Sequence, residues 1–235
     1  MPPYSHPLLG PVNVVRSTRA RRLTLSVRAS GEVRLTIPPG VSRDEALRFL
    51  DEKQQWAGRA RERLRQRHPP QRIGPVFSTR RHVLELIPGT CAAPSFQVRN
   101  GVIRVRYPAA LGHEDESVQR TIQQGIEQAW RIEAKQYLPA RVAQLCRTLG
   151  FRCGTVTIRN SRSRWGSCSA SNDLSLSLHL MKLPDRLIDY IITHELCHTR
   201  HKNHGPAFHA LLDNMTAGRH LQLRQELKGY STRWN

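Results

Sequence analysis

The chain has 235 residues, of which 38% are hydrophobic, enough for one large or two small globular domains. Its formal charge is +19, from 37 lysines and arginines against 18 acidic residues, which favours nucleotide or nucleic-acid partners or else reflects arginines spread over solvated faces. Composition argues against two classes of protein. No apolar run approaches the roughly 18 residues of a membrane span, and the five cysteines contain no Cys-x-x-Cys pair, as a disulfide framework or zinc ribbon would. We therefore expect a cytoplasmic protein with reduced thiols and no membrane partner.

The first part of the chain alternates apolar and polar residues. We expect a flexible tail over residues 1–11 and strands within residues 12–40. Ser42 followed by Glu45 has the spacing of a helix capping box. A helix is therefore predicted from there to about Arg67, where a His-Pro-Pro sequence ends it.

A second β-rich stretch runs over residues 73–107. It contains Asn100-Gly101, a strong signal for a hairpin turn. We accordingly assign residues 12–110 to a β-rich N-terminal region with one helix. Residues 114–149 then have helical periodicity, with Gly150 as the expected C-cap, and Pro139 predicts a break in that helix.

The last part of the chain, residues 111–235, is predicted as a separate domain. Residues 155–159 form an expected strand, and leucines alternate with polar residues over 174–180, the pattern of a half-buried strand. Its polar edge would suit pairing with an extended peptide. A proline-free amphipathic helix is predicted over 185–200, followed by a short helix from Pro206.

The expected helix over 185–200 contains His194-Glu195-Leu196-Cys197-His198. Two histidines four residues apart lie on one helix face, so both imidazoles can reach one zinc ion. A glutamate beside the first histidine can take a proton from water activated by that metal. The motif predicts metal-assisted hydrolysis with Glu195 as the general base.

The third ligand is predicted from spacing. His204 follows His194 by ten residues, the spacing of the metzincin motif, although His201 stands where that motif has glycine. Glu226 and Asp213 remain alternatives, since either would give a site of two histidines and one carboxylate. Zinc is inferred from the ligand types, and the same ligands also suit manganese or nickel.

A second motif, Arg164-Trp165-Gly166-Ser167-Cys168-Ser169, precedes the metal motif. Together with Asn203-His204 and Phe208, the pair of motifs resembles the YgjP-like metallopeptidase family, which is related to the SprT-like and WLM zinc peptidases. The resemblance implies an α+β fold with a β-rich N-terminal half and a zincin-like C-terminal half, in which a small sheet and packed helices hold the metal-binding helix. It also implies Zn2+ bound by His194, His198 and His204, with Glu195 as the catalytic residue.

Peptide or protein is the substrate class that this resemblance implies. Candidates for contact with the substrate or the oxyanion are Tyr190, Arg162, Arg164 and His179. Two alternatives remain open: a metal-dependent nucleoside triphosphate pyrophosphatase, which the charge would favour, and a DNA-associated SprT-like protease. No Gly-rich phosphate loop with Gly-Lys occurs, which counts against the first alternative.

Overall fold

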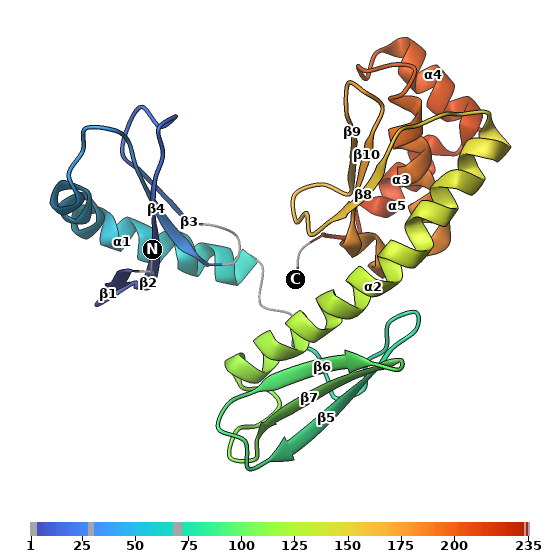
Figure 1. The fold of residues 1–235 in the computed structure, drawn as a ribbon. Helices are drawn as coiled ribbons and strands as arrows, with labels where there is room; N and C mark the ends of the chain where they lie inside the picture. The colour runs from blue at the N-terminus through green and yellow to red at the C-terminus, as the bar shows by residue number, and fades with distance from the viewer. Residues whose placement is uncertain (1–3, 28–30, 68–71, 233, 235) are drawn as a thin grey trace. The chain divides into compact units, whose positions relative to one another are not determined.

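The computed structural model describes residues 4–27, 31–67, 72–232 and 234 of a mixed α+β protein. The strands within these residues form three small sheets (Figure 1). The contacts divide the chain into two compact units, one ending at Gln71 and the other running from Arg72 to Trp234. No helix within the described ranges is long and apolar enough to cross a lipid bilayer.

The first unit packs one helix against a small sheet. Its elements are β1 (Tyr4–His6), β2 (Gly10–Arg16), β3 (Thr24–Val27), β4 (Val33–Ile37) and α1 (Arg43–Arg67). The strand order is β1-β2-β4-β3, with β2 parallel to β4. The start of α1 is as predicted, since the Glu45 N–H donates to the Ser42 hydroxyl at 3.1 Å. The predicted stop at residues 68–70 lies outside the described residues.

The predicted flexible tail is wrong for residues 4–11, which belong to β1, β2 and the turn between them. The buried His6 side chain holds this turn. Its Nδ1 accepts the N–H groups of Leu8 and Leu9, each at 3.2 Å, and its Nε2 lies 2.9 Å from Asp51 Oδ1. Because this contact is polar, it is not accompanied by an apolar periodicity from which the strands could have been predicted. Residues 1–3 lie outside the described part of the chain.

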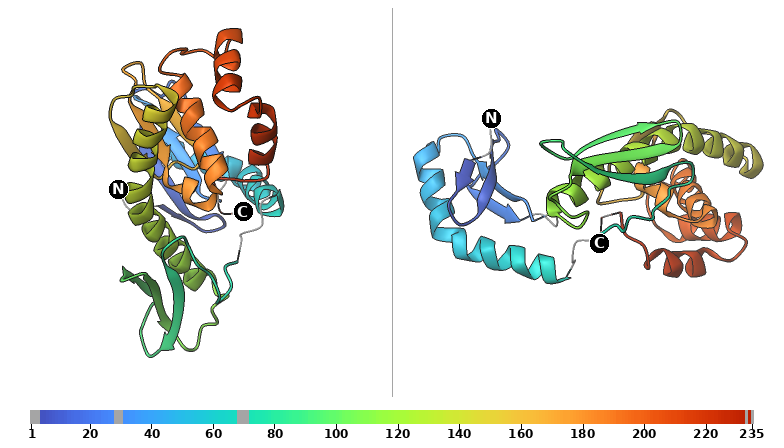
Figure 2. Two further views of the ribbon diagram at one scale, coloured as in Figure 1. Left: turned by 90° about the vertical axis from the view of Figure 1, so that its right-hand side faces the viewer. Right: turned by 90° about the horizontal axis from the view of Figure 1, so that it is seen from below.

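Helix α2 (Glu116–Leu149) runs the length of the second unit, and both views in Figure 2 show a sheet against its first half and the remaining elements against its second half. Gly150 caps its C-terminus with a left-handed φ of 70°, as expected. The predicted break at Pro139 is wrong, because the helix continues through it. Leu138 and Val142 are buried on either side, and this packing offsets the missing backbone hydrogen bond.

The first sheet of this unit consists of β5 (Val83–Gly89), β6 (Ser95–Arg99) and β7 (Val102–Pro108), in the order β5-β7-β6. The Asn100-Gly101 hairpin turn forms as predicted, with φ of 51° and 75°. Ile103 and Val105 of β7 belong to the same buried core as Ile122 of α2. For this reason the contacts divide the chain after Gln71, and not after residue 110 as the sequence pattern indicates.

The second sheet consists of β8 (Val156–Arg159), β9 (Gly166–Cys168) and β10 (Leu174–Ser177), in the order β8-β10-β9. The strand expected over 174–180 ends at Ser177, whose hydroxyl accepts the His179 N–H at 3.3 Å and so begins the 3-10 helix η1 (Leu178–Lys182). The leucines of η1 are buried like those of β10, which explains why the alternation continues beyond the strand. Since β10 is central, the expectation that it offers a free edge is wrong.

Three helices complete the unit: α3 (Asp185–Cys197), α4 (Pro206–Met215) and α5 (His220–Leu227). In Figure 1, α2 and α3 lie on the same side of the β8–β10–β9 sheet, and α2 contacts β8 while α3 contacts β9. Leu174 and Leu176 of β10 are fully buried in this core. The sheet therefore holds α3 by one of its faces.

Candidate metal centre

Helix α3 carries the first two histidines of the predicted site. Its buried face, which includes Ile188, Ile192 and Leu196, fixes the helix in the core. This leaves His194 half-buried on the neighbouring face. The helix ends at Cys197, a little earlier than predicted, and His198 is its C-cap residue.

A turn after α3 brings His204 back to the helix. The Lys202 ammonium secures this turn by donating to the Ser169 carbonyl at 2.8 Å and to Asn172 Oδ1 at 2.5 Å, both beside the connection from β9 to β10. Phe208 of α4 is fully buried beneath the three imidazoles. Its ring centroid lies 5.0, 4.5 and 4.8 Å from those of His194, His198 and His204.

The three imidazoles converge through the same ring atom. His204 Nε2 lies 3.2 Å from His194 Nε2 and 3.1 Å from His198 Nε2. In a tetrahedral zinc site with Zn–N bonds of about 2.0–2.1 Å, ligand nitrogens are about 3.3 Å apart. Among the described residues, these three form the group whose potential metal-ligating atoms all lie within 4.8 Å of one another. The donor set and its spacing fit a zinc-sized ion.

The other ring nitrogen of His198 has a carbonyl partner. His198 Nδ1 lies 3.0 Å from the carbonyl oxygen of His201, which can only accept a hydrogen bond. The proton must then be on Nδ1, and the lone pair on Nε2 is directed at the other two histidines. His201, which interrupts the metzincin-like spacing, thus contributes its backbone to the site.

Burial also keeps the rings of His194 and His198 neutral. It lowers the pKa of His194 to about 4, with the neighbouring His198 and His204 lowering it further. Burial likewise lowers the pKa of His198. Neutral imidazole is the form that binds metal, so these donors are ready to bind near neutral pH.

The buried Glu195 side chain lies against β9. Gly166 makes this possible, because a Cβ there would lie 2.8 Å from both Cγ and Oε1 of Glu195. Burial raises the pKa of the Glu195 carboxyl to about 7, against the lowering effect of the Arg164 charge. A carboxyl of this kind can exchange a proton near neutral pH.

Similarity to known proteins identifies the family of this chain. A family model described as YgjP-like, metallopeptidase domain, matches residues 21–230. The chain belongs to the YgjP-like metallopeptidase family. Membership implies a catalytic metal and peptide or protein substrates.

Two solved structures are similar to part of this YgjP-like chain. The metallopeptidase zymogen jannalysin of Methanocaldococcus jannaschii is 25% identical, covers 38% of this chain and 95% of its own, and has a TM-score of 0.32. The metallopeptidase zymogen abylysin of Pyrococcus abyssi is 18% identical, covers 39% of this chain and 91% of its own, and has a TM-score of 0.36. No curated protein matches the sequence.

The alternative ligands of the YgjP-like chain are engaged elsewhere. Glu226 accepts hydrogen bonds from the guanidinium of Arg186, one of them at 3.1 Å. Asp213 Oδ1 lies 2.8 Å from His220 Nδ1. Neither carboxylate belongs to the histidine cluster.

The four predicted contact residues separate into two groups. Tyr190 and Arg164 lie at the site, since the Tyr190 ring is edge-on to His194 with centroids 6.4 Å apart and Arg164 acts on the Glu195 carboxyl. Arg162 instead pairs with Glu127 of α2 at 2.7 Å.

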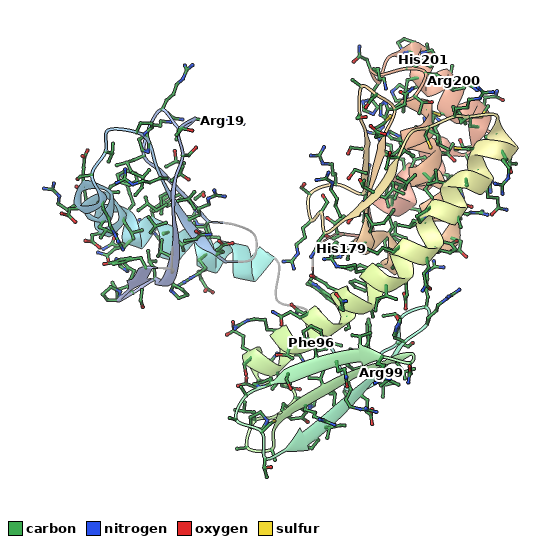
Figure 3. All side chains as sticks on the ribbon, in the orientation of Figure 1. Arg19, Phe96, Arg99, His179, Arg200 and His201 are labelled. Atoms are coloured by element: carbon green, nitrogen blue, oxygen red, sulfur yellow. The ribbon has the colours of Figure 1, made fainter. Side chains whose placement is uncertain are left out.

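His179 (labelled in Figure 3) is fully buried. Its Nε2 lies 2.9 Å from Asn160 Oδ1, and its ring is edge-on to Trp130 with centroids 5.7 Å apart. In this conformation the imidazole is sealed in the core and cannot contact a substrate.

Sequence reasoning missed the supporting residues Phe208, Lys202 and Gly166. Phe208 and Gly166 belong to the motifs that carry the family resemblance, but a motif does not state what its members touch. The spacing of His198 and His204 around a tight turn indicates only that something must hold that turn.

Proposed function

We propose that the chain is a zinc-dependent peptidase in which His194, His198 and His204 hold the metal and Glu195 is the general base. The observation that carries the proposal is the convergence of three Nε2 atoms at 3.1–3.2 Å, next to a buried carboxyl. When bound, zinc would supply a Lewis acid that polarises the peptide carbonyl and makes water acidic enough to react near neutral pH.

The residues of the chain then have separate roles. The imidazoles of His194, His198 and His204 would hold the cation without cancelling its charge. The Glu195 carboxylate takes the proton of the attacking water and returns it to the amine that leaves. Tyr190 is a candidate donor to the oxyanion, because burial raises the pKa of its hydroxyl and keeps it protonated. Arg164, whose charge lowers the pKa of Glu195, is a second candidate for stabilising the oxyanion.

Strand β9 is the natural place for an extended substrate. Among the described residues it pairs with β10 alone, so its other edge is a row of backbone groups beside Glu195. A peptide that added to this edge would present its carbonyls along α3. We therefore propose that an extended peptide pairs with Gly166–Cys168, and not with residues 174–180 as the sequence suggests.

Glu195→Gln tests the chemistry, because it keeps the shape of the side chain and removes the base. Wild type and variant, both zinc-loaded, are compared on an unfolded protein and on a panel of nucleotides. We expect peptide cleavage to fall by about 100-fold or more with zinc content unchanged. Loss of phosphate release alone would instead support the pyrophosphatase alternative, which rests on net charge.

His204→Ala tests the ligand set, with Glu226→Ala as the matched variant. We expect zinc to be lost from the first and retained by the second, measured by metal content after dialysis against a weak chelator. Equal loss from both, or greater loss from Glu226→Ala, would contradict the assignment of His204.

A further inference from the structure

The outer face of the β8–β10–β9 sheet carries mainly hydroxyl and charged side chains. A groove of about 620 Å³ lies on it, lined among others by Thr157, Arg159, Arg164, Ser167, Asp173 and Ser175. Ser175 is in register with Thr157 on one side and with Ser167 on the other, so the three hydroxyls form a row across the strands. Helices α2 and α3 lie on the opposite side (Figure 1).

The groove offers donors that have no hydrogen-bond or ion-pair partner among the described residues. Among the described residues, neither Arg159 nor Arg164 lies within 4 Å of a carboxylate oxygen. Arg162, between them in sequence, does pair with Glu127. The hydroxyls of Ser167 and Ser175 likewise make no hydrogen bond to another described residue.

Among the described residues, the charged carboxylate of Asp173 in the lining forms no ion pair with either arginine. Asp173 Oδ1 accepts the Thr155 N–H at 2.8 Å, and Oδ2 accepts the Ser171 hydroxyl at 2.7 Å. Its carboxylate is therefore engaged in holding the connection from β9 to β10. The open part of the groove presents guanidinium groups and hydroxyls, which suit a carboxylate.

One end of the groove, at Ser167, lies on the strand with which a bound peptide would pair. In an added strand, successive side chains point to opposite faces of the sheet. A peptide paired with β9 would direct one set of side chains toward Glu195 and α3. The alternate set would lie on the face of Ser167, over the groove.

We propose that this groove binds acidic side chains at alternate positions of the peptide substrate, and that the enzyme prefers acidic sequences. The inference rests on the proposed peptidase function and on strand addition at β9. Arg159 is then a specificity-determining residue that does not touch the reacting atoms. Its guanidinium would pair with a Glu or Asp side chain of the substrate.

The test uses two fluorescent peptides that differ only in having Glu or Gln at alternate positions. Binding is measured by anisotropy on zinc-loaded Glu195→Gln, and cleavage is measured on the wild type. We expect about tenfold tighter binding and a similarly higher kcat/KM for the Glu peptide, with the ratio falling as salt is raised. Arg159→Gln is then introduced into both proteins. It should bring the Glu-to-Gln ratio of affinity and of kcat/KM close to one, without changing cleavage of the Gln peptide.

Arg99→Gln, on β6 in Figure 3, is the matched control, because it removes the same charge from an exposed strand away from the groove. It should leave the ratio unchanged. A ratio near one in the wild type, or an equal drop in Arg99→Gln, would overturn the inference. So would a single-stranded oligonucleotide that displaces the Glu peptide and needs Arg159 to do so, since the groove would then be a nucleic-acid site. Preferential binding without any cleavage would refute the peptidase function and leave the groove assignment standing.

Discussion

The two sheets of the second unit have the same topology but different roles. In each, the first and third strands are parallel and the second is antiparallel to the third. The β5–β7–β6 sheet packs on α2 through an apolar face, with Ile103 and Val105 at its centre. The β8–β10–β9 sheet places a three-residue strand, β9, beside the metal-binding helix. Strand topology by itself does not specify a site.

A glycine lies at each sheet–helix contact, but on opposite sides. In the first sheet the glycine is on the helix: a Cβ on Gly125 of α2 would lie 2.8 Å from Ile103 Cγ2. In the second it is on the strand, where Gly166 makes room for the Glu195 carboxyl. The first close approach buries an aliphatic side chain and contributes stability, whereas the second buries a carboxyl and serves chemistry.

Gly166→Ala should have the largest effect. A Cβ at this position must displace the Glu195 side chain, and an error of about 1 Å in a catalytic group can cost about 100-fold in rate. We expect a loss of peptide cleavage of that order with zinc content and thermal stability nearly unchanged. Gly89→Ala, at the end of β5, is the control, because its Cβ would meet nothing within 4 Å. Equal activities of the two variants would mean that Gly166 does not position Glu195.

Gly125→Ala should affect stability and not catalysis. The added methyl group overpacks the contact with Ile103 at a cost of about 1–3 kcal/mol, and alanine returns up to about 1 kcal/mol through helix propensity. We expect a lower urea midpoint with kcat/KM unchanged. Gly58 of α1 is also a helical glycine, but its Cβ would meet nothing within 4 Å. Gly58→Ala should be neutral or stabilising, and a similar gain in Gly125→Ala would contradict the close contact.

A smaller difference concerns a buried histidine beside each sheet. His82 lies 2.8 Å from the carboxylate of Glu133 on α2. His179 instead has the Asn160 amide between it and Glu127. Since the Asn160 carbonyl oxygen accepts from Nε2, the buried Nδ1 has no partner among the described residues and cannot accommodate a proton easily. Burial, with Lys182 adding to it, lowers the pKa of His179 to about 4.

The sign of the pH dependence follows from this shift. Between the ordinary histidine pKa of about 6.5 and the native value of about 4, the unfolded chain binds a proton that the native state does not. The free energy of unfolding should therefore fall as pH decreases through this window. In the zinc-free protein, His179→Gln should reduce the fall seen in urea titrations at pH 7 and pH 4.5, whereas His113→Gln should not. An imidazole of His179 that titrates near pH 6.5 by NMR would refute the argument.

Local features of the sequence predicted the elements that local physics controls. The Ser42 cap, the Asn100-Gly101 turn and the Gly150 cap form as expected, because each depends on a few neighbouring residues. The same holds for His194, Glu195 and His198, whose positions relative to one another are fixed by the helix repeat. The break expected at Pro139 did not occur, since the local penalty there is outweighed by core packing on both sides.

By itself, then, the sequence determined that two histidines and a glutamate share a helix, and it identified the family to which that motif belongs. Only the tertiary structure decided what surrounds them. Phe208 comes beneath all three imidazoles, and Gly166 meets Glu195 from a strand 29 residues earlier in the chain. The physical reason is that helix periodicity acts over a few residues, whereas the space for the carboxyl and the support for the imidazoles come from contacts between distant segments.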